Sequence, residues 1–379
     1  GRMSAGSISV QKSAIGGSIA LVIAHCAGMI DLIALPVWVG ALVERFGFRP
    51  QEAGALVTFF LLGAVAASAV VAPRFNRLNQ RLAATGGFGA AAIIFFLASA
   101  QTAFVPLAGL HLLAGLSLGT ALSMVHGTIG RSANPHRLFA MAGMAVGLTG
   151  IVLLGAIPQL LIARGGPALF HVFAVVMAIA AVACALLFLN PPVMAEERHA
   201  PFSRATWFTI LGVSVMTFNQ AMVFSFVEVI GKTRGFEPSS VLAVLIALGI
   251  INFLVPSPLA ALLQKRLPAT LVVQVGPAVQ ALLALVVTMA TAFSLWAPAA
   301  AVFVAIQIFT HTFAFGLLAR LDPSGRAVAA TPAMLMIGAA LGPIVGGALG
   351  EHFGFGALGF AAVLVALAAI AFFTKAKTA

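Results

Sequence analysis

Apolar residues occupy this chain in long runs that are separated by short polar segments. A run of ~20 apolar residues is the length of α-helix that crosses the hydrocarbon core of a bilayer. The runs lack a polar face, which favours buried or membrane-spanning helices over amphipathic helices and alternating strands. About twelve such spans fit the chain, each with boundaries uncertain by ~4 residues. We expect them at 15–40, 53–73, 83–103, 106–129, 138–163, 167–190, 206–230, 240–263, 269–291, 297–319, 327–349 and 355–374.

The composition agrees with a membrane protein and excludes a water-soluble domain of ordinary surface. Hydrophobic residues make up 61% of the chain, charged residues only 8%, and the mean hydropathy is +1.12. The two cysteines, Cys26 and Cys184, both fall within apolar runs, so a secreted disulfide framework is not expected. The predicted fold class is therefore an all-α integral membrane protein with the bilayer as its main partner.

The formal charge of +11 suggests nucleic acid at first, but the basic residues are sorted by loop. Alternate loops and both chain ends carry most of them: Arg2, Lys12, Arg74, Arg77, Arg81, Arg131, Arg137, Arg198, Arg204, Lys265, Arg266, Arg320, Arg326, Lys375 and Lys377. The other loops carry Arg45, Arg49, Arg164, Lys232 and Arg234. Positive residues stay on the cytoplasmic side, which predicts cytoplasmic N- and C-termini in a bacterial inner membrane and no nucleic-acid partner.

The chain also repeats itself, which is typical of transporters built from duplicated halves. Three matches occur in the same order, at offsets between 185 and 189 residues: Gly47-Phe48-Arg49-Pro50 with Gly235-Phe236-Glu237-Pro238, Arg81-Leu82-Ala83-Ala84-Thr85 with Arg266-Leu267-Pro268-Ala269-Thr270, and Arg131 and Arg137 with Arg320 and Arg326. Matching loops have the same expected sidedness, so the halves are parallel repeats. We expect a six-helix bundle at 1–190, a polar cytoplasmic linker at 191–205 and a second six-helix bundle at 206–379.

One loop and one glycine-rich run carry a family resemblance. The segment APRFNRLNQR, residues 72–81, resembles the G-x-x-x-D-R-x-G-R-R loop of the major facilitator superfamily, with Asn76 at the acidic position. The run GAALGPIVGG, residues 338–347, resembles that family's glycine-proline signature, although it lies in the eleventh span. His111 takes the place of the usual arginine in the fourth span. The resemblance covers essentially the whole chain and implies two pseudo-symmetric bundles, alternating access and a monomer.

Some residues of these motifs are candidates for conformational roles. Most glycines in membrane spans serve close helix packing. Gly342, Pro343 and Gly346 can additionally form a flexible point in the eleventh span. Arg77 and Arg81, which remain in the degraded loop, are expected to contribute to gating by the same resemblance.

Asp31 is the acidic residue that lies well inside an expected span, and no other does. A charged side chain at that depth costs ~2.5 to 3.5 kcal/mol on insertion scales, so intramembrane acids indicate function. Removal from water disfavours the carboxylate anion, which allows a carboxyl at this depth to load and release a proton. We therefore predict that Asp31 couples transport to protons. The alternative is a structural hydrogen bond to a neighbouring helix.

Further polar residues lie on spans that line the central cavity in the resembled family. His25 on the first span, Asn219 and Gln220 on the seventh, and Gln307 and His311 on the tenth are the expected substrate-binding residues. Asn219 stands at the position equivalent to Asp31, and His311 is also a candidate proton relay. Each of these residues can instead serve as interhelical hydrogen-bonding glue. His25 and Asp31 lie ~120° apart around a helix, which argues against a direct pair.

The spacing of His25, Cys26 and Met29 is compatible with soft-metal coordination, so a transition-metal transporter is one alternative. A non-transporting sensor on the same scaffold is another. The absence of paired carboxylates or a phosphate-binding loop argues against an enzyme and against a nucleotide or other cofactor. A proton gradient is the expected energy source. The 30 phenylalanines, the absence of tyrosine and the lack of a mid-span cation favour a small, partly hydrophobic organic solute.

Overall fold

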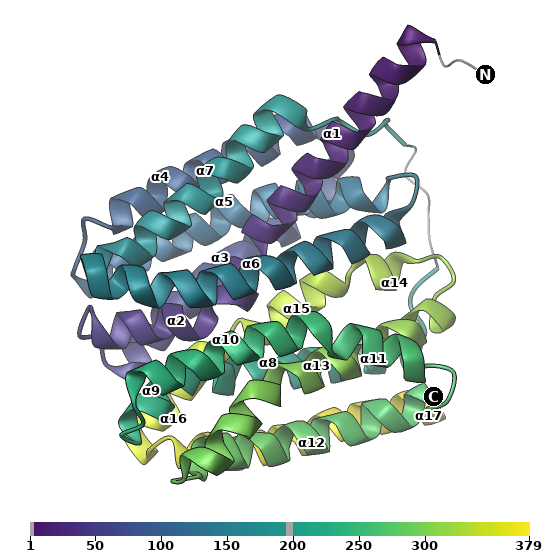
Figure 1. Cartoon of the computed structure of the whole chain (residues 1–379). Helices are drawn as coiled ribbons and strands as arrows, with labels where there is room; N and C mark the ends of the chain where they lie inside the picture. Colours follow the sequence, from purple (N-terminus) through teal and green to yellow (C-terminus); the bar gives the residue numbers. More distant parts are fainter. Residues whose placement is uncertain (1–3, 195–199) are drawn as a thin grey trace.

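The computed structural model describes residues 4–194 and 200–379, and these residues are helical apart from short connections (Figure 1). Twelve stretches of helix in the described residues are long and apolar enough to cross a membrane, which confirms the predicted number. The helices are α1 (Ala5–Gly28), α2 (Ile30–Glu44), α3 (Pro50–Val71), η1 (Ala72–Arg77), α4 (Gln80–Ala98), α5 (Phe104–Gly130), α6 (Pro135–Arg164), α7 (Pro167–Leu187), α8 (Arg204–Phe224), α9 (Val227–Thr233), α10 (Pro238–Leu254), α11 (Pro256–Leu263), α12 (Ala269–Met289), α13 (Phe293–Leu321), α14 (Arg326–Ala329), α15 (Thr331–Ala339), α16 (Gly342–Phe353) and α17 (Gly356–Thr378).

Several spans consist of more than one helix, and this changes their expected limits. The first span runs over Ala5–Glu44 and is interrupted at Met29, between α1 and α2. The seventh runs over Arg204–Thr233, because α9 continues it beyond a break at the end of α8. The sequence expected these spans at 15–40 and 206–230. Both predictions were too short because polar residues at the helix ends lowered the apparent hydrophobicity there.

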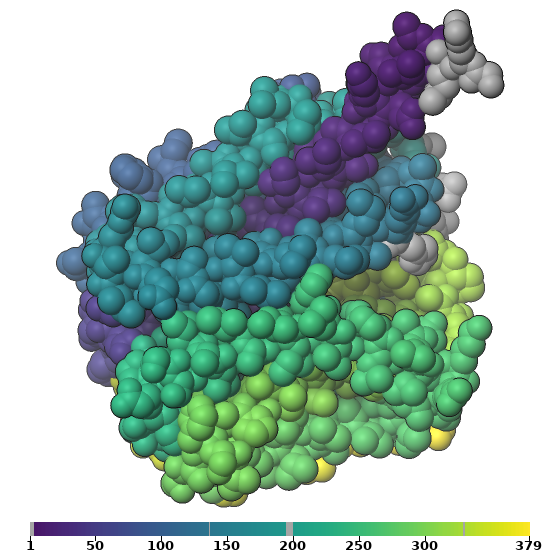
Figure 2. Space-filling model, in the orientation of Figure 1, coloured from purple at the N-terminus to yellow at the C-terminus, as the bar shows by residue number. Residues whose placement is uncertain are grey.

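The helices gather into two groups that follow the order of the chain. The first six spans, α1 to α7, lie together in the upper part of Figure 1, and the last six, α8 to α17, lie below them. Within the groups α5 packs on α3 and α4, and α17 packs on α8 and α12. The space-filling view shows the seam between them, where α6 lies against α10 (Figure 2). Of the expected linker, residues 195–199 lie outside the described residues.

Both termini lie at the same end of the helices (Figure 1), which we call the terminal end; the opposite end is the distal end. The two bundles approach closely in the distal half. Gly54 of α3 lies against the backbone carbonyl of Pro343 in α16, and Gly347 of α16 lies against that of Pro50. A β-carbon at either glycine would collide with the facing backbone. These glycines therefore let helices from different bundles touch, where lipid supplies no hydrophobic drive for association.

Candidate functional site

Asp31 lies on the first turn of α2, directly after the interruption of the first span. Gly28, the last residue of α1, is pressed against the Leu122 side chain of α5, and Met29 connects the two helices with φ −99° and ψ 21°. A helix N-terminus favours negative charge, so the break gives the carboxylate a compensating dipole. Asp31 is 4% exposed, and its Oδ1 atom has no hydrogen-bond partner. Burying a carboxyl with an unpaired oxygen destabilises the fold, so its presence inside a membrane span indicates a function.

The Asp31 side chain lines a small pocket between the two bundles. The pocket has a volume of ≈ 10 Å³, which is room for about one water molecule. Its remaining walls come from both halves of the chain: Leu32, Leu35 and Leu61 from the first, and Thr217, Gln220, Ala221, Phe224 and Ala339 from the second. The site is thus mostly apolar with a few polar groups, and in this conformation it is closed around Asp31.

Gln307 belongs to a polar network just behind this pocket, inside the second bundle. Its amide nitrogen donates to Thr217 Oγ1 at 2.9 Å, and its carbonyl oxygen accepts from Gln280 of α12 at 2.9 Å. Gln280 also donates to the backbone carbonyl of Met216 at 3.2 Å. Thr217 lines the pocket, so the network connects Gln307 to the site through one hydroxyl. The fixed amides orient the wall opposite Asp31.

Asn219 and Gln220 point in different directions, although the sequence analysis expected both to bind substrate. Gln220 lines the pocket, and its buried Oε1 atom has no hydrogen-bond partner. Asn219 is completely buried and donates to the backbone carbonyl of Ala362 in α17 at 2.8 Å. Successive residues of a helix are ~100° apart, so only one of the two can face the other bundle. The structure places Gln220 in the pocket with Asp31 and packs Asn219 against α17 inside its own bundle.

His25 pairs with another histidine. Its Nδ1 atom lies 2.9 Å from Nε2 of His126 in α5, so one ring donates and the other accepts. Phe139 of α6 packs on both rings. Within the described residues, no group of three or more His, Cys, Asp or Glu side chains is placed to hold a metal ion.

The two remaining histidines of interest differ in how well they are satisfied. His111 accepts a hydrogen bond from the Trp38 indole at 3.2 Å, while its Nδ1 lies 2.7 Å from the Leu107 carbonyl. Both of its ring nitrogens are occupied, as in a structural residue. His311 of α13 stacks on Phe315 with ring centroids 4.7 Å apart, and its Nδ1 has no hydrogen-bond partner. A free ring nitrogen leaves His311 able to contact a ligand or carry a proton.

The predicted gating residues lie in separate parts of the structure and make different contacts. Arg81 donates to Asn190 through its backbone N–H at 2.8 Å and to the Ala185 carbonyl through its guanidinium, so it joins helices of its own bundle. Arg77 ends η1 and is exposed. In the eleventh span, the helix breaks between α15 and α16 directly before Gly342 and Pro343. Gly342 and Gly346 both press on α8, where a β-carbon would lie 2.6 Å from Ala221 Cβ and from the Met222 carbonyl.

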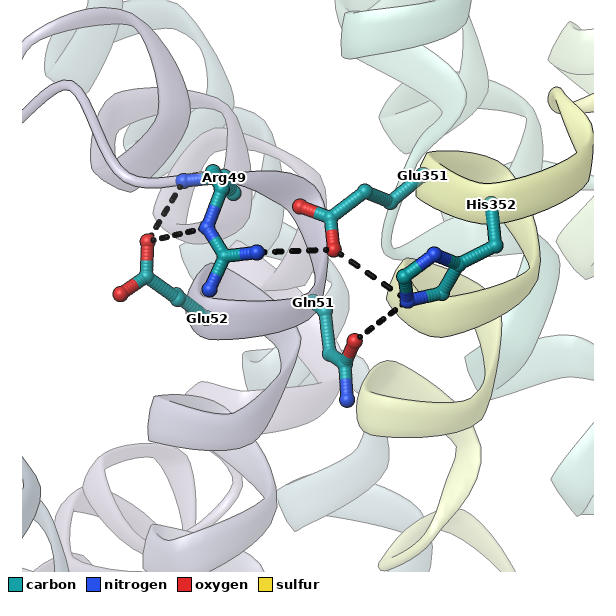
Figure 3. Close-up of polar contacts among 5 residues, drawn as sticks. All are labelled: Arg49, Gln51, Glu52, Glu351 and His352. Carbon is teal, nitrogen blue, oxygen red and sulfur yellow. Dashed lines mark hydrogen bonds and ion pairs between the residues drawn. The ribbon is translucent and has the colours of Figure 1, made fainter.

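The polar contacts that join the bundles all lie in the distal half, among the residues that the structure describes. Figure 3 shows one group of them: Arg49 bridges Glu52 of its own helix and Glu351 of α16, at 3.2 and 3.3 Å, and His352 contacts Gln51 at 3.0 Å. The others are Lys232 with Glu44 at 2.7 Å, and the Ile344 N–H with Thr58 Oγ1 at 3.1 Å. The distal end is thus held closed.

The sequence analysis overlooked a second buried acid, Glu228, because the seventh span was expected to end near it. Glu228 lies on α9 with 6% exposure, 3.0 Å from the Lys232 ammonium. His126, Thr217 and Gln280 were also missed as partners. The spacing of Thr217 and Gln220, three residues apart on one helical face, was a signal for the pocket. No sequence signal indicated that His25 would meet His126, 101 residues away.

Comparisons with known proteins agree with this architecture. The model of the Major Facilitator Superfamily matches residues 20–331. A search of curated protein sequences finds no match to the chain.

Two kinds of solved transporter structure share the fold. One is a bacterial homologue of the human lysosomal transporter Spinster in an inward-facing, occupied conformation, with a TM-score of 0.74, 14% identity, and coverage of 95% of this chain and 96% of that one. The same homologue in an unoccupied conformation gives a TM-score of 0.66 at 13% identity, with coverage of 97% and 96%. The nucleoside transporter NupG gives 0.71 at 14% identity, with coverage of 95% and 99%.

Proposed function

The chain belongs to the major facilitator superfamily, and on that premise we propose that it moves a small, partly hydrophobic organic solute across a membrane by alternating access. It is a multi-pass membrane transporter and not an enzyme, as the sequence predicted. The proposal adds that transport is coupled to protons through Asp31. A proton gradient supplies the energy, without a cofactor, and the working unit is a monomer.

One observation carries the proposal: Asp31 is 4% exposed, its Oδ1 atom has no hydrogen-bond partner, and it shares a pocket between the bundles with Thr217 and Gln220. The exposure of a carboxyl in that position to water changes whenever the two bundles move relative to each other. Protonation lowers the free-energy cost of burying this carboxyl, because the neutral acid loses far less solvation than the anion does. Loading a proton therefore favours closure around Asp31, and losing it favours reopening. This dependence couples a proton to the transport cycle.

The walls of the site support the solute class. Leucine, phenylalanine and alanine side chains form most of the pocket, and Gln220, Thr217 and Asp31 supply the polar contacts. No lysine or arginine lines it, so a multiply anionic solute would lack a charge partner. Gln307 orients Thr217, while His25 and His311 extend the polar contacts towards the terminal end. Asn219 acts through the packing of α8 on α17, because its amide is already engaged there.

The sorting of basic residues supports an orientation with both termini in the cytoplasm. The terminal end then faces the cytoplasm, and the closed distal end faces the outside. In this orientation the polar contacts between the bundles lie in the outer half of the membrane protein. Gly342, Pro343 and Gly346 provide the bend that α15 and α16 need for the change to the opposite state, and Arg77 and Arg81 adjust the cytoplasmic loop between the second and third spans.

The first test is a thermal-shift screen of the purified protein at pH 6 and pH 8. The panel contains organic acids, amines, neutral aromatics, nucleosides and divalent metals, because a native-state ligand raises the melting temperature by mass action. We expect an organic compound to stabilise the protein more at pH 6. The pH dependence should disappear in Asp31→Asn and persist in the matched control Asp322→Asn, whose carboxyl lies in an exposed loop.

A reconstituted assay then measures proton-driven accumulation of that compound in liposomes. Asp31→Asn should still bind the solute but lose accumulation. Full accumulation in Asp31→Asn would exclude the coupling role. Stabilisation by a metal that is lost on replacing His25 would exclude the organic solute. A compound that binds but is never transported would indicate a sensor.

A further inference from the structure

Glu228 sits against a backbone of the other bundle. If Gly40 of α2 carried a β-carbon, that atom would lie 2.7 Å from Glu228 Oε2 and 3.0 Å from its carboxyl carbon. The carboxyl therefore occupies the space that a side chain at position 40 would fill. Its Oε2 atom is buried and has no hydrogen-bond partner, although Oε1 is paired with Lys232 at 3.0 Å. Gly40, which belongs to the opposite bundle, thus shields the Oε2 atom of Glu228 from water.

The contact joins positions that are equivalent in the two halves of the chain. The repeat that aligns Gly47 with Gly235 also aligns Gly40 with Glu228 and Glu44 with Lys232. Both aligned pairs are also in contact, Gly40 with Glu228 and Glu44 with Lys232. Equivalent residues meet in this way only next to a twofold pseudo-symmetry axis. These contacts therefore lie beside the pseudo-symmetry axis at the distal end, and they separate when rocking of the bundles opens that end.

The charges around Glu228 are few. Lys232 on its own helix pairs with it and with Glu44 of α2, and Arg45, directly after α2, adds a positive charge. In the second bundle α10 and α12 pack on α9 and contain no charged residue, and α13 contacts α9 through the uncharged Trp296. Arg234, directly after α9, is turned away and donates to the carbonyls of Thr288 and Ala290.

Opening the distal end changes these surroundings in a defined way. Lys232 stays with Glu228, because both belong to α9. Glu44 and Arg45 leave together with α2, and their opposite charges largely cancel. What remains is the loss of the Gly40 contact, which lets water reach Oε2. A carboxylate anion gains more from water than a neutral carboxyl does, so opening favours the anion and closure favours the protonated acid.

We propose that Glu228 is a second proton-binding residue of the transport cycle, which takes up one proton when the distal end closes over it and returns that proton to distal-side water when the end opens. The step converts a carboxylate and a proton into a carboxylic acid, with no other reactant. This deepens the proposed function by adding a proton site on the distal side of Asp31. It rests on the proposal that the chain is proton-coupled, but not on the role of Asp31.

The test follows the distal end directly and needs no substrate. Spin labels are placed at Thr102→Cys and Ser294→Cys, exposed positions of the two bundles at the distal end, in a background of Cys26→Ala and Cys184→Ala. Pulsed electron paramagnetic resonance measures the distance between the labels in nanodiscs from pH 5 to pH 8. The closed fraction should rise as the pH falls, because the closed state binds the proton more tightly. One proton changes the ratio of closed to open molecules by at most about tenfold per pH unit.

In Glu228→Gln, a neutral side chain of the same shape, we expect a closed fraction that is high and independent of pH. Glu237→Gln, an exposed acid at the same end, should keep the pH dependence of the wild type. Gly40→Ala should lower the closed fraction at every pH, whereas Gly89→Ala, which has open space, should not. These glycine variants keep the test informative if Glu228→Gln folds poorly.

A closed fraction that does not respond to pH in the wild type, or that responds equally in Glu228→Gln, overturns the proposal. The outcome is separate from that of Asp31. If Asp31→Asn loses accumulation while Glu228→Gln keeps the pH response, the proposed function stands and this inference fails. If Asp31→Asn transports normally while Glu228→Gln loses the pH response, the coupling site is Glu228 and the assignment of Asp31 fails.

Discussion

The first and seventh spans are repeats of one another, yet they carry their acids at different depths. In the first span Asp31 lies midway, at the pocket between the bundles, and the equivalent residue of the seventh span is the neutral Asn219. In the seventh span Glu228 lies near the distal end, and the equivalent residue of the first span is Gly40. At each depth one half supplies a carboxyl and the other half supplies none.

This difference shows how a duplicated fold acquires a site in which only one half supplies the carboxyl. A carboxyl at position 40 would face Glu228 across the pseudo-symmetry axis, and the two would repel on closure. One carboxyl opposite a neutral or absent side chain can be buried when the bundles meet. Glu44 and Lys232 illustrate the same rule further out, because the repeat places opposite charges at equivalent positions and they pair at 2.7 Å.

Moving the acid between the halves should have the largest effect. In the double variant Asp31→Asn/Asn219→Asp the chain keeps its composition but places the carboxyl beside the Ala362 carbonyl of α17. We expect no recovery of proton-driven accumulation, at least a tenfold loss, and destabilisation by several kcal/mol, because the new anion is buried without a partner. Liposome uptake and thermal melting measure both effects. Recovery of accumulation would show that the halves are interchangeable.

Removing Lys232 should have the next largest effect, on stability. While the Glu228 carboxyl is ionised, Lys232→Gln leaves it buried beside Glu44 without a cation between the two acids. Loss of one partner of a buried pair costs about 3–5 kcal/mol, and we expect the lower end of this range or less because Lys232 is partly exposed. The double variant Lys232→Gln/Glu228→Gln should regain most of the loss in melting temperature. If the double variant is no more stable than the single one, the cost comes from packing.

The number of spans and the two bundles could be predicted from the sequence because apolar run length and basic loops are local properties. The family assignment followed from the spacing of loop residues. The limits of the seventh span could not be predicted, since α9 carries Glu228 and Lys232, whose pairing offsets their charge only in the folded chain. The charged residues of α9 therefore made this segment look like a loop, and Glu228 was not recognised as a buried acid.

The candidate site was predictable in part. Asp31 was found because an acid inside an apolar run has few explanations. The interruption at Met29 was not predicted, because it depends on Gly28 meeting Leu122 of α5. The equivalence of Asn219 to Asp31 was visible in the repeat, but the repeat does not state that Asn219 would bond to α17. Equivalence in the repeat predicts the depth of a residue along its span, whereas packing against neighbouring helices decides the direction in which its side chain points.

Close packing between the bundles should have a moderate effect. Gly54→Ala places a methyl group against the backbone of Pro343 in the other bundle, whereas Gly89→Ala enters open space. Overpacking costs about 1–3 kcal/mol, and backbone cannot move aside as a side chain can. We expect Gly54→Ala to lower the melting temperature by a few degrees and to reduce distal closure. Gly89→Ala should leave both unchanged. Equal melting temperatures would mean that α3 and α16 separate without cost.

The smallest effect concerns the loops that precede the fifth and eleventh spans, which are also equivalent. Asn134 accepts a hydrogen bond from the Arg137 N–H at 3.1 Å, and Asp322 accepts one from the Ala327 N–H at 2.8 Å and one from Ser324 Oγ at 2.6 Å. The Ser324 hydroxyl, followed by the Ala327 N–H, lowers the pKa of the Asp322 carboxyl below its ordinary value.

A carboxyl with a lowered pKa in the folded state contributes stability above its unfolded-state pKa and loses it as the pH falls through the folded-state pKa. Asp322 is partly exposed in a loop, and water screens its charge, so we expect the contribution to stay within about 0.5 kcal/mol. Asp322→Asn should keep the cap, as Asn134 does in the first half, and should remove only this acid-dependent part. Thermal melting from pH 3 to pH 7 measures the difference. A large loss of stability at pH 7 would show that the second half needs the charge itself, whereas its equivalent loop needs only the hydrogen bond.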